Sequence, residues 1–228
     1  LAIRALRARG VRVVLKTLIT RTNAAGYRSV RALADELGCA HTMDARVLPC
    51  ESGAAGPCAQ RPDGGALLEL YGEVAPEGLE GLFRSSLSSG ELNARPCMAG
   101  DSSLFVASDG LVFPCVALKT PCGNVLEESL ADIWRSSAPL KRIRSIRWQD
   151  LHTCSSCSLR RYCCHCIAIA LTEHGDVTAA ATESCRHAVV RRDLLRERGY
   201  LPAGETDLPP PFAAGPADSE PEQESLRL

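Results

Sequence analysis

Cysteine spacing is the feature of this sequence that points most directly to chemistry. The chain has 228 residues, and 12 of them are cysteines. Five of the 12 lie close together, as Cys154-x2-Cys157-x5-Cys163-Cys164-x-Cys166. A C-x2-C step brings two thiolates to one metal centre, whereas adjacent half-cystines make an awkward disulfide framework in a chain long enough to bury its own core. We therefore expect metal or cluster ligation, with disulfides as the lesser alternative.

Composition and charge exclude several other classes of protein. Hydrophobic residues make up 45% of the chain and charged residues 23%, which is ordinary for a globular protein. No apolar stretch approaches the roughly 18 residues that a membrane-spanning helix needs, so we expect no membrane segment. The formal net charge is −1, and the basic run 141–147 is interrupted by Ile143 and Ile146 at helical spacing. This run predicts a solvated helix face, and we expect no nucleic-acid partner.

The start of the chain predicts alternating helices and strands. Residues 1–9 and 27–37 have helical patterns, and a glycine follows each of them. Residues 11–19 form an apolar, β-branched run typical of a strand, and a second short strand is expected over 43–48. This alternation indicates a parallel βα sheet or barrel, although two such units cannot close a barrel alone.

A change of composition after this region predicts a domain boundary. Residues 49–65 are rich in proline, glycine, alanine and serine, and they include Cys50 and Cys58. We interpret them as a linker. Beyond the linker, a short extended piece is expected over 67–71 and a short helix over 79–87.

The next motif has the pattern of a β-hairpin. Its strands are expected over 103–107 and 111–114. Asp109-Gly110 between them would supply the positive φ angles of a tight primed turn. Cys115 follows the returning strand directly, and Cys97 precedes the outgoing one. The two sulfurs can therefore approach each other if residues 98–102 curl back.

The rest of the chain predicts helices and then a tail. Asn124 with Glu127 forms a capping box at the start of a helix. The apolar face of that helix would contain Leu126, Leu130, Ile133 and Trp134. An apolar segment follows at 167–171, and a further helix ends near Gly199. Residues 201–228 hold six prolines and six acidic residues, so we expect them to be disordered.

The order of the cysteines resembles that of a known domain. Seven of them occur, with one glycine, as Cys97-x12-Gly110-x4-Cys115, then Cys154-x2-Cys157-x5-Cys163-x2-Cys166, then Cys185. This order resembles the SPASM domain, the C-terminal extension of certain radical S-adenosylmethionine enzymes that include peptide maturases. Gly123-Asn124-Val125 and Glu173-His174-Gly175-Asp176 resemble the family's flanking sequence. The resemblance extends over residues 96–188. Residues 1–49 resemble the last βα units of the partial TIM-like barrel in these enzymes.

The resemblance implies two auxiliary [4Fe–4S] clusters. By position, Cys154, Cys157, Cys163 and Cys185 would hold one cluster, and Cys97, Cys115 and Cys166 would hold the other. Four thiolates are the usual ligand set of such a cluster. In two-cluster ferredoxins the last cysteine of a tight run likewise binds the neighbouring cluster. No catalytic acid or base can be named from the sequence.

Three features depart from the family pattern. The family often ends its run with C-x3-C, whereas here Cys163-x2-Cys166 includes an additional Cys164, so the choice between Cys163 and Cys164 stays open. The cluster with three assigned thiolates has Cys122 as a candidate fourth ligand, and an open iron site is the alternative. No cysteine of the sequence has partners four and seven positions further on. The Cys-x3-Cys-x2-Cys motif that generates the radical is therefore absent from these residues.

Other interpretations of the same residues remain. Zinc is the alternative to a cluster, because C-x2-C is also half of a structural zinc site. Cys39 is expected to be a small buried residue, and Cys50 and Cys58 are expected to be loop thiols. His165, between two cysteines, has the chemistry of a ligand, but it is interpreted as a hydrogen-bond donor near a ligand or as an exposed residue.

The resemblance also implies a fold. We expect an α/β fragment followed by a small α+β, cysteine-rich SPASM domain with a β-hairpin and auxiliary clusters. The expected divisions are the end of a radical S-adenosylmethionine barrel (1–49), a linker region (50–95), the SPASM domain (96–188), a C-terminal helix (189–200) and a disordered tail (201–228).

The implied function is that of the C-terminal part of a cytoplasmic radical S-adenosylmethionine enzyme acting on a peptide or protein side chain. Its reductant would be a flavodoxin or ferredoxin. S-adenosylmethionine and a third [4Fe–4S] cluster are expected only in a missing N-terminal part. The alternative is a non-catalytic module that binds zinc or a cluster.

Overall fold

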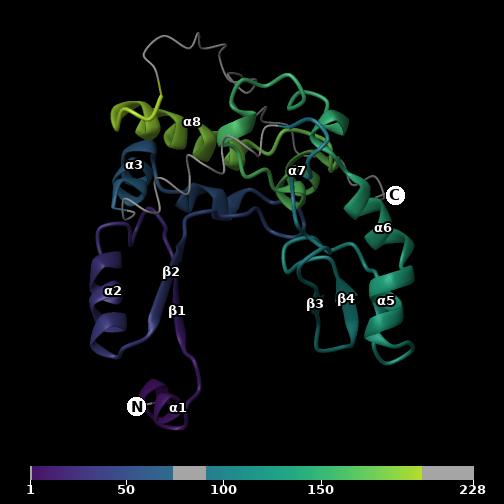
Figure 1. Ribbon diagram of the computed structural model, residues 1–228, viewed down its shortest axis with the longest axis horizontal. Helices are drawn as coiled ribbons and strands as arrows, with labels where there is room; N and C mark the ends of the chain where they lie inside the picture. The colour runs from purple at the N-terminus through teal and green to yellow at the C-terminus, as the bar shows by residue number, and fades with distance from the viewer. Residues whose placement is uncertain (1, 74–90, 202–228) are drawn as a thin grey trace. The chain divides into compact units, whose positions relative to one another are not determined.

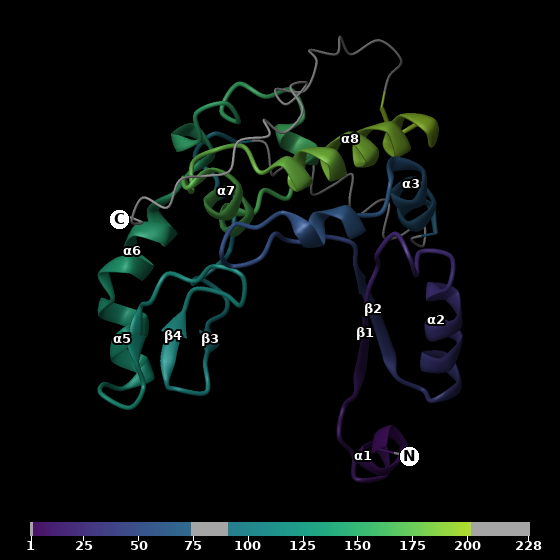
Figure 2. The same cartoon turned by 180° about the vertical axis from the view of Figure 1, so that it is seen from behind.

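The chain divides into two compact units in a computed structural model that describes residues 2–73 and 91–201. Unit 1 comprises Leu1–Cys50 and Ala54–Glu73, and unit 2 comprises Glu51–Gly53 and Val74–Leu228. Figure 1 and Figure 2 show the elements from opposite sides. Each unit is described by itself. The predicted domain limits stay a prediction.

Unit 1 is a β–α–β arrangement followed by a further helix. It contains α1 (Ala2–Ala8), β1 (Val14–Leu18), α2 (Tyr27–Glu36), β2 (Ala40–Asp44), the 3-10 helix η1 (Gly56–Gln60) and α3 (Gly64–Gly72). β1 and β2 pair in parallel, with Val14 opposite Ala40 and Leu18 opposite Asp44. α2 connects the two strands and lies beside them (Figure 1). The alternation of helix and strand is confirmed, although β2 lies earlier than the expected 43–48. Two strands do not test the partial barrel, which stays a prediction.

The extended piece expected over 67–71 is wrong, because these residues lie in α3. Asp63 caps this helix by accepting a hydrogen bond from the backbone N–H of Ala66 at 2.8 Å. Leu67 and Leu70, three residues apart, are both buried. A short apolar run has the same appearance in a buried strand and in a buried helix. The cap at Asp63 is the signal that favours the helix.

Ion pairs join α3 to α2. Arg28 on α2 pairs with Glu69 and Glu73, which lie on α3 and at its C-terminal cap. Tyr27 beside Arg28 is buried, and burial, with the nearby Glu73 carboxylate, raises its pKa to about 12. These contacts attach residues 64–73 to the first unit.

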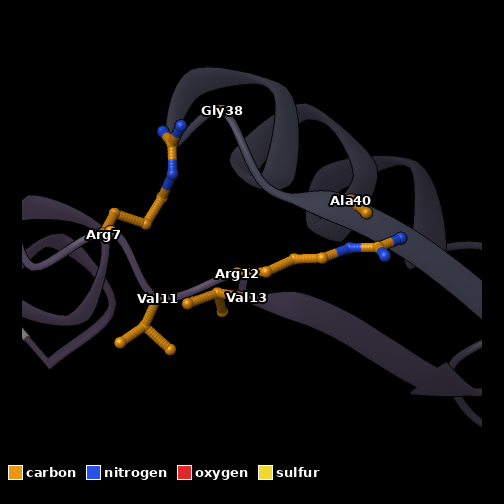
Figure 3. Close-up of a pocket in the computed structure, with 7 residues that line it drawn as sticks. Arg7, Val11, Arg12, Val13, Gly38 and Ala40 are labelled. Atoms are coloured by element: carbon orange, nitrogen blue, oxygen red, sulfur yellow. The ribbon is translucent and has the colours of Figure 1, made fainter.

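A pocket of about 370 Å³ lies in unit 1 where β1 and β2 begin (Figure 3). It is lined by Arg7, Gly10, Val11, Arg12, Val13, Gly38 and Ala40. Arg7 donates a hydrogen bond to the carbonyl of Leu37, so its guanidinium lies against the end of α2. None of these lining residues is a cysteine, and the pocket is therefore not part of the predicted metal site.

Unit 2 combines a small antiparallel sheet with short helices. It contains β3 (Phe105–Val106), β4 (Leu111–Phe113), β5 (Gly123–Asn124), α5 (Leu130–Ser136), α6 (Ala138–Ser145), the 3-10 helices η2 (Trp148–Asp150) and η3 (Arg160–Tyr162), α7 (Ile167–His174) and α8 (Thr182–Glu197). The sheet order is β3-β4-β5, and α8 packs against both η3 and α7. The helix expected over 79–87 and the tail 202–228 lie outside the described residues. None of the helices within 2–73 and 91–201 combines the length and apolar character needed to cross a membrane.

The expected β3–β4 hairpin is confirmed, but its turn differs from the prediction. The Gly110 N–H donates to the carbonyl of Ala107 at 3.0 Å, and the Ala107 N–H donates to Leu111 at 2.8 Å. Gly110 has a φ of 87°, whereas Asp109 has no positive φ. This is the longer loop in which a glycine in the left-handed region follows an ordinary turn.

The capping box expected at Asn124 is also wrong. Asn124 lies in β5 opposite Leu111, and its side chain accepts a hydrogen bond from the Leu126 N–H at 2.9 Å. Ser129 caps α5 instead, by accepting from the Asp132 N–H at 3.1 Å. The third strand, which the sequence did not suggest, therefore occupies the residues assigned to the helix start.

The basic run 141–147 is only partly a solvated face. It is helical as far as Ser145, the last residue of α6, as its spacing predicted. Arg144, however, is half-buried. It donates to the carbonyls of Gly100 and Trp134 at 2.6 Å, and its guanidinium lies 4.4 Å from the centre of the Trp134 ring. Arg144 thus holds the loop that follows Cys97.

Candidate iron–sulfur site

Three cysteines that are remote in sequence lie together in unit 2. The first cysteine group consists of Cys97, Cys115 and Cys166. All three pack against one buried apolar cluster that includes Leu118 and Ile167. Burial raises the pKa of Cys97, and the thiols of Cys166 and Cys115 raise it further. Such an effect between thiolates requires them to be close to one another.

The loop between Cys97 and β3 turns back as the sequence suggested. The Gly100 N–H donates to the carbonyl of Pro114 at 2.8 Å, which brings the residues after Cys97 to the residue before Cys115. Gly100 has a φ of 72°, and a Cβ there would lie 2.8 Å from Cδ2 of Leu140. Only glycine meets both conditions without strain.

Backbone N–H groups point at two sulfurs of this group. The Ala99 N–H donates to Sγ of Cys97 at 3.5 Å, and the Leu118 N–H donates to Sγ of Cys115 at 3.3 Å. Hydrogen bonds of this kind stabilise thiolates and contribute to the reduction potential of iron–sulfur clusters.

The second cysteine group consists of Cys154, Cys157, Cys163 and Cys185. Cys154 and Cys157 precede η3, Cys163 follows it directly, and Cys185 lies on α8. Burial raises the pKa of Cys163 well above its usual value, and Cys185, Cys154 and Cys164 add to the effect. Burial, with contributions from Cys154 and Cys157, likewise raises the pKa of Cys185 to about 12. The sulfurs of this group therefore share one enclosed environment.

The donor set of both groups fits iron–sulfur ligation. The raised pKa values apply to thiols, whereas iron binds thiolates, so cluster binding would release protons. Among the described residues, no three histidine, cysteine, aspartate or glutamate side chains converge on a point that could hold a single metal ion. Thiolates are the usual ligands of [4Fe–4S] clusters and also suit zinc.

The remaining cysteines lie apart from these groups or at their edge. Cys122 is buried among Val112, Ile133 and Leu140, and its thiol donates to the carbonyl of Thr120 at 3.3 Å. Burial raises its pKa, which is influenced by Ser137 and by nearby arginines rather than by cysteines. The other four differ in exposure: Cys164 and Cys50 are exposed, Cys58 is half-buried and Cys39 is buried. All 12 cysteines are free thiols, so the disulfide alternative finds no support in the structure.

His165 is buried, which the sequence did not indicate. Only 4% of its surface is exposed, and burial lowers its pKa to about 4 against a smaller opposing effect from the Val177 backbone. Glu183, fully buried on α8, was also missed, and its carboxylate accepts hydrogen bonds from Arg186 at 2.6 Å and His187 at 3.2 Å. The i, i+3, i+4 spacing of these three residues was the available signal.

A family comparison identifies the class of domain that contains Cys97, Cys115, Cys154 and Cys157. Residues 97–158 match the SPASM family, described as an iron-sulfur cluster-binding domain. The resemblance drawn from the order of the cysteines is thereby confirmed. The extent predicted beyond residue 158 stays a prediction, as do the individual ligand roles.

Individual relatives agree with this assignment. The chain is 30% identical over 208 residues to PqqA peptide cyclase of Xanthomonas campestris pv. campestris (strain 8004), which covers 85% of this chain and 55% of the relative. It is 34% identical over 84 residues to AdoMet-dependent heme synthase of Nitratidesulfovibrio vulgaris, covering 36% and 22%. The chain thus spans about half the length of the first of these relatives. It carries a SPASM domain and is homologous to radical S-adenosylmethionine enzymes of the SPASM type.

Proposed function

We propose that this chain provides the auxiliary-cluster part of a radical S-adenosylmethionine enzyme that modifies a peptide or protein side chain. The observation that supports this most strongly is the gathering of cysteines from distant segments into two groups, in a chain whose residues 97–158 match an iron–sulfur cluster-binding domain. The homology to a protein named PqqA peptide cyclase supports the choice of a peptide substrate.

In this proposal each cysteine group holds one [4Fe–4S] cluster. Cys97, Cys115 and Cys166 would bind one cluster, and Cys154, Cys157, Cys163 and Cys185 would bind the other. A bound cluster supplies an electron acceptor or an iron that contacts the substrate. The chain buries Cys154 and Cys185 and covers the other five proposed ligands in part, and the N–H groups of Ala99 and Leu118 would stabilise thiolate charge.

Radical generation would require residues beyond these 228. The sequence contains no Cys-x3-Cys-x2-Cys motif, so S-adenosylmethionine and its cluster would be bound by another part of the protein. Residues 1–49 would contribute the last βα units of the barrel that holds them. A flavodoxin or ferredoxin would supply electrons, and the cytoplasm is the expected compartment.

Anaerobic reconstitution with iron and sulfide tests the proposal. We expect about eight irons per chain, with matching acid-labile sulfide and Mössbauer signals of two [4Fe–4S] clusters. Cys154→Ala/Cys157→Ala should reduce the count to about four. Cys50→Ala, an exposed cysteine outside both groups, serves as the control and should keep the full count. Bound zinc without acid-labile sulfide would overturn the proposal.

The second candidate is a non-catalytic module that binds a cluster or zinc. The absence of the radical-generating motif from these residues fits this candidate as well as it fits a longer enzyme. The coding sequence upstream of Leu1 separates the two candidates. An in-frame Cys-x3-Cys-x2-Cys supports the enzyme, and a start codon next to Leu1 supports the module.

A further inference from the structure

His165 lies on the short segment that connects the two cysteine groups. Cys163 of the second group precedes it by two residues, and Cys166 of the first group follows it directly. Its ring meets the ring of Trp148 edge to face, with centroids 5.8 Å apart and planes at 60°. Trp148 in turn belongs to the buried cluster that contains Cys154 and contacts Cys163. The imidazole is therefore next to the second cysteine group.

The ring is almost fully buried and its polar atoms are unsatisfied. Only 4% of the residue is exposed, and neither Nδ1 nor Nε2 has a hydrogen-bond partner among the described residues. The Val177 backbone lies close enough to act on the pKa as a weak hydrogen-bond acceptor, but it does not reach ordinary hydrogen-bond geometry with either nitrogen. Buried polar side chains in native proteins are nearly always hydrogen-bonded, because an unmade bond is costly. A partner that the protein part does not supply is therefore expected.

An iron–sulfur cluster is a partner of the right chemistry. Its sulfides and thiolates accept hydrogen bonds, and an imidazole carries at least one N–H in either protonation state. Hydrogen bonds to cluster sulfur raise the reduction potential, because the reduced cluster is the more negative state and gains more from a donor.

We propose that His165 donates a ring N–H to a sulfur of the cluster held by the second cysteine group and thereby raises the reduction potential of that cluster. This inference rests on the proposed function, because it requires the cluster. His165 acts as a positioning and tuning residue and not as an iron ligand. The contact with Trp148, which packs with Cys154 and Cys163, supports the choice of the second group.

The test is a redox titration of the whole reconstituted chain followed by electron paramagnetic resonance. His165→Phe keeps a planar ring of similar size without the N–H, and His165→Gln keeps an N–H donor. His152→Gln, an exposed histidine, is the matched control. We expect His165→Phe to keep its iron and to lower the potential of one cluster only. His165→Gln should recover part of the shift, and the control should match the parent.

Measurements on the unmodified protein keep the proposal testable if a variant does not fold. Pulsed ENDOR of the reduced protein in H2O and D2O should detect an exchangeable proton at the cluster, and selective ¹⁵N-histidine labelling should couple to it weakly. Strong ¹⁵N coupling, or iron loss in both variants, overturns the proposal in favour of direct ligation. Unchanged potentials, or a shift confined to the cluster that Cys97→Ala removes, also overturn it. Failure of the parent chain to bind iron and sulfide overturns the proposed function as well, whereas intact clusters with an unaltered potential overturn only this inference.

Discussion

Individual cysteines in unit 2 differ more in their surroundings than in their sequence spacing. Cys115 is partly buried and receives an N–H bond from Leu118, whereas Cys122, seven positions later, lies in a purely aliphatic cluster. Burial raises the pKa of Cys122 as it raises that of Cys97, but other cysteines contribute only to the shift of Cys97. This difference separates a candidate ligand from a packing residue.

Cys122→Ala should leave the iron content of the reconstituted protein unchanged, because its sulfur is directed at Thr120 and not at the first cysteine group. Loss of the buried thiol should lower the free energy of unfolding by about 1 kcal/mol. Cys115→Ala, the matched variant, should lose about four irons per chain. Iron analysis and urea unfolding measure both effects, and iron loss in Cys122→Ala would make Cys122 the fourth ligand.

Glu183→Ala should lower the free energy of unfolding by about 1–3 kcal/mol, because it removes the hydrogen bonds that the buried carboxylate accepts from His187 and Arg186. Urea titration followed by circular dichroism measures the change. Glu197→Ala, at an exposed position of the same helix, should stay within about 0.5 kcal/mol of the parent. Equal losses in the two variants would contradict a special role for the buried carboxylate.

Asp44 should make the folding stability of the protein sensitive to acid. Burial raises its pKa, but hydrogen bonds from the Arg46 side chain and backbone, with the charges of Arg46 and Lys16, outweigh burial and leave the pKa below its usual value. The resulting stability is present above the unfolded pKa of about 3.9 and is lost as pH falls through the folded pKa. Since Arg46 is partly exposed, we expect about 0.5–1 kcal/mol. Thermal unfolding between pH 6 and pH 3 should show a smaller loss in Asp44→Asn than in the parent.

At the scale of elements, the loop from Cys97 to β3 depends on one backbone conformation. Gly100 combines a positive φ with a close approach to Leu140. Arg144 and Pro114 hold the same glycine by hydrogen bonds from both sides. The position of Cys97 relative to Cys115 therefore depends on this turn.

Gly100→Ala should destabilise unit 2 by more than the roughly 1–2 kcal/mol that the left-handed conformation costs alone, because its Cβ would also displace Leu140. Gly175→Ala has a similar φ of 69° with no heavy atom near the added Cβ, so it should show the conformational cost only. The difference between their melting temperatures isolates the contact. Identical melting temperatures would mean that Leu140 moves aside freely.

Elements with strong local signals were predictable from the sequence, and those settled by tertiary pairing were not. The β3–β4 hairpin followed from Asp109-Gly110, and α2 followed from its apolar spacing. Asn124 and Ser129 are both good capping residues, and only the pairing of Asn124 with Leu111 assigns the cap to Ser129. The start of α5 could not be read from local pattern for this reason.

The candidate site was predictable only in part. Through family resemblance, the order of the cysteines suggested which of them belong together. Sequence spacing alone does not predict how far Cys97 lies from Cys166 in space. Nothing in the sequence signalled that His165 is buried, because a histidine between two cysteines can be buried or exposed and the local sequence does not distinguish the two. Burial depends on Trp148, which is remote from any motif.

For the molecule as a whole, both cysteine groups lie in the same one of the two units. Both groups lie in unit 2, and their members come from loops and from α8. Unit 1 holds Cys39, Cys50 and Cys58, which join neither group. Cluster ligation would thus cross-link segments of unit 2 only.

Removing iron from the reconstituted chain with a chelator should therefore loosen unit 2 and leave unit 1 unchanged, because metal binding free energy contributes to folding where the ligands lie. Hydrogen exchange should accelerate at Leu118 and Ile167, which pack beside the first group, and stay constant across β1 and β2. The parent and Cys50→Ala proteins, both treated with EDTA, should behave alike. Uniform acceleration in both units would contradict this separation.

The segment from Cys163 to Cys166 also has a consequence for the order of assembly. Cys154 and Cys185 are 31 positions apart, whereas Cys97 and Cys166 are 69 positions apart. Closing the longer loop costs about 0.7 kcal/mol more in chain entropy, because the cost grows with the logarithm of loop length. The second group should therefore capture iron first. Once it has closed, Cys166 is already tethered beside it, so early iron uptake would nucleate the long-range contacts of the unit.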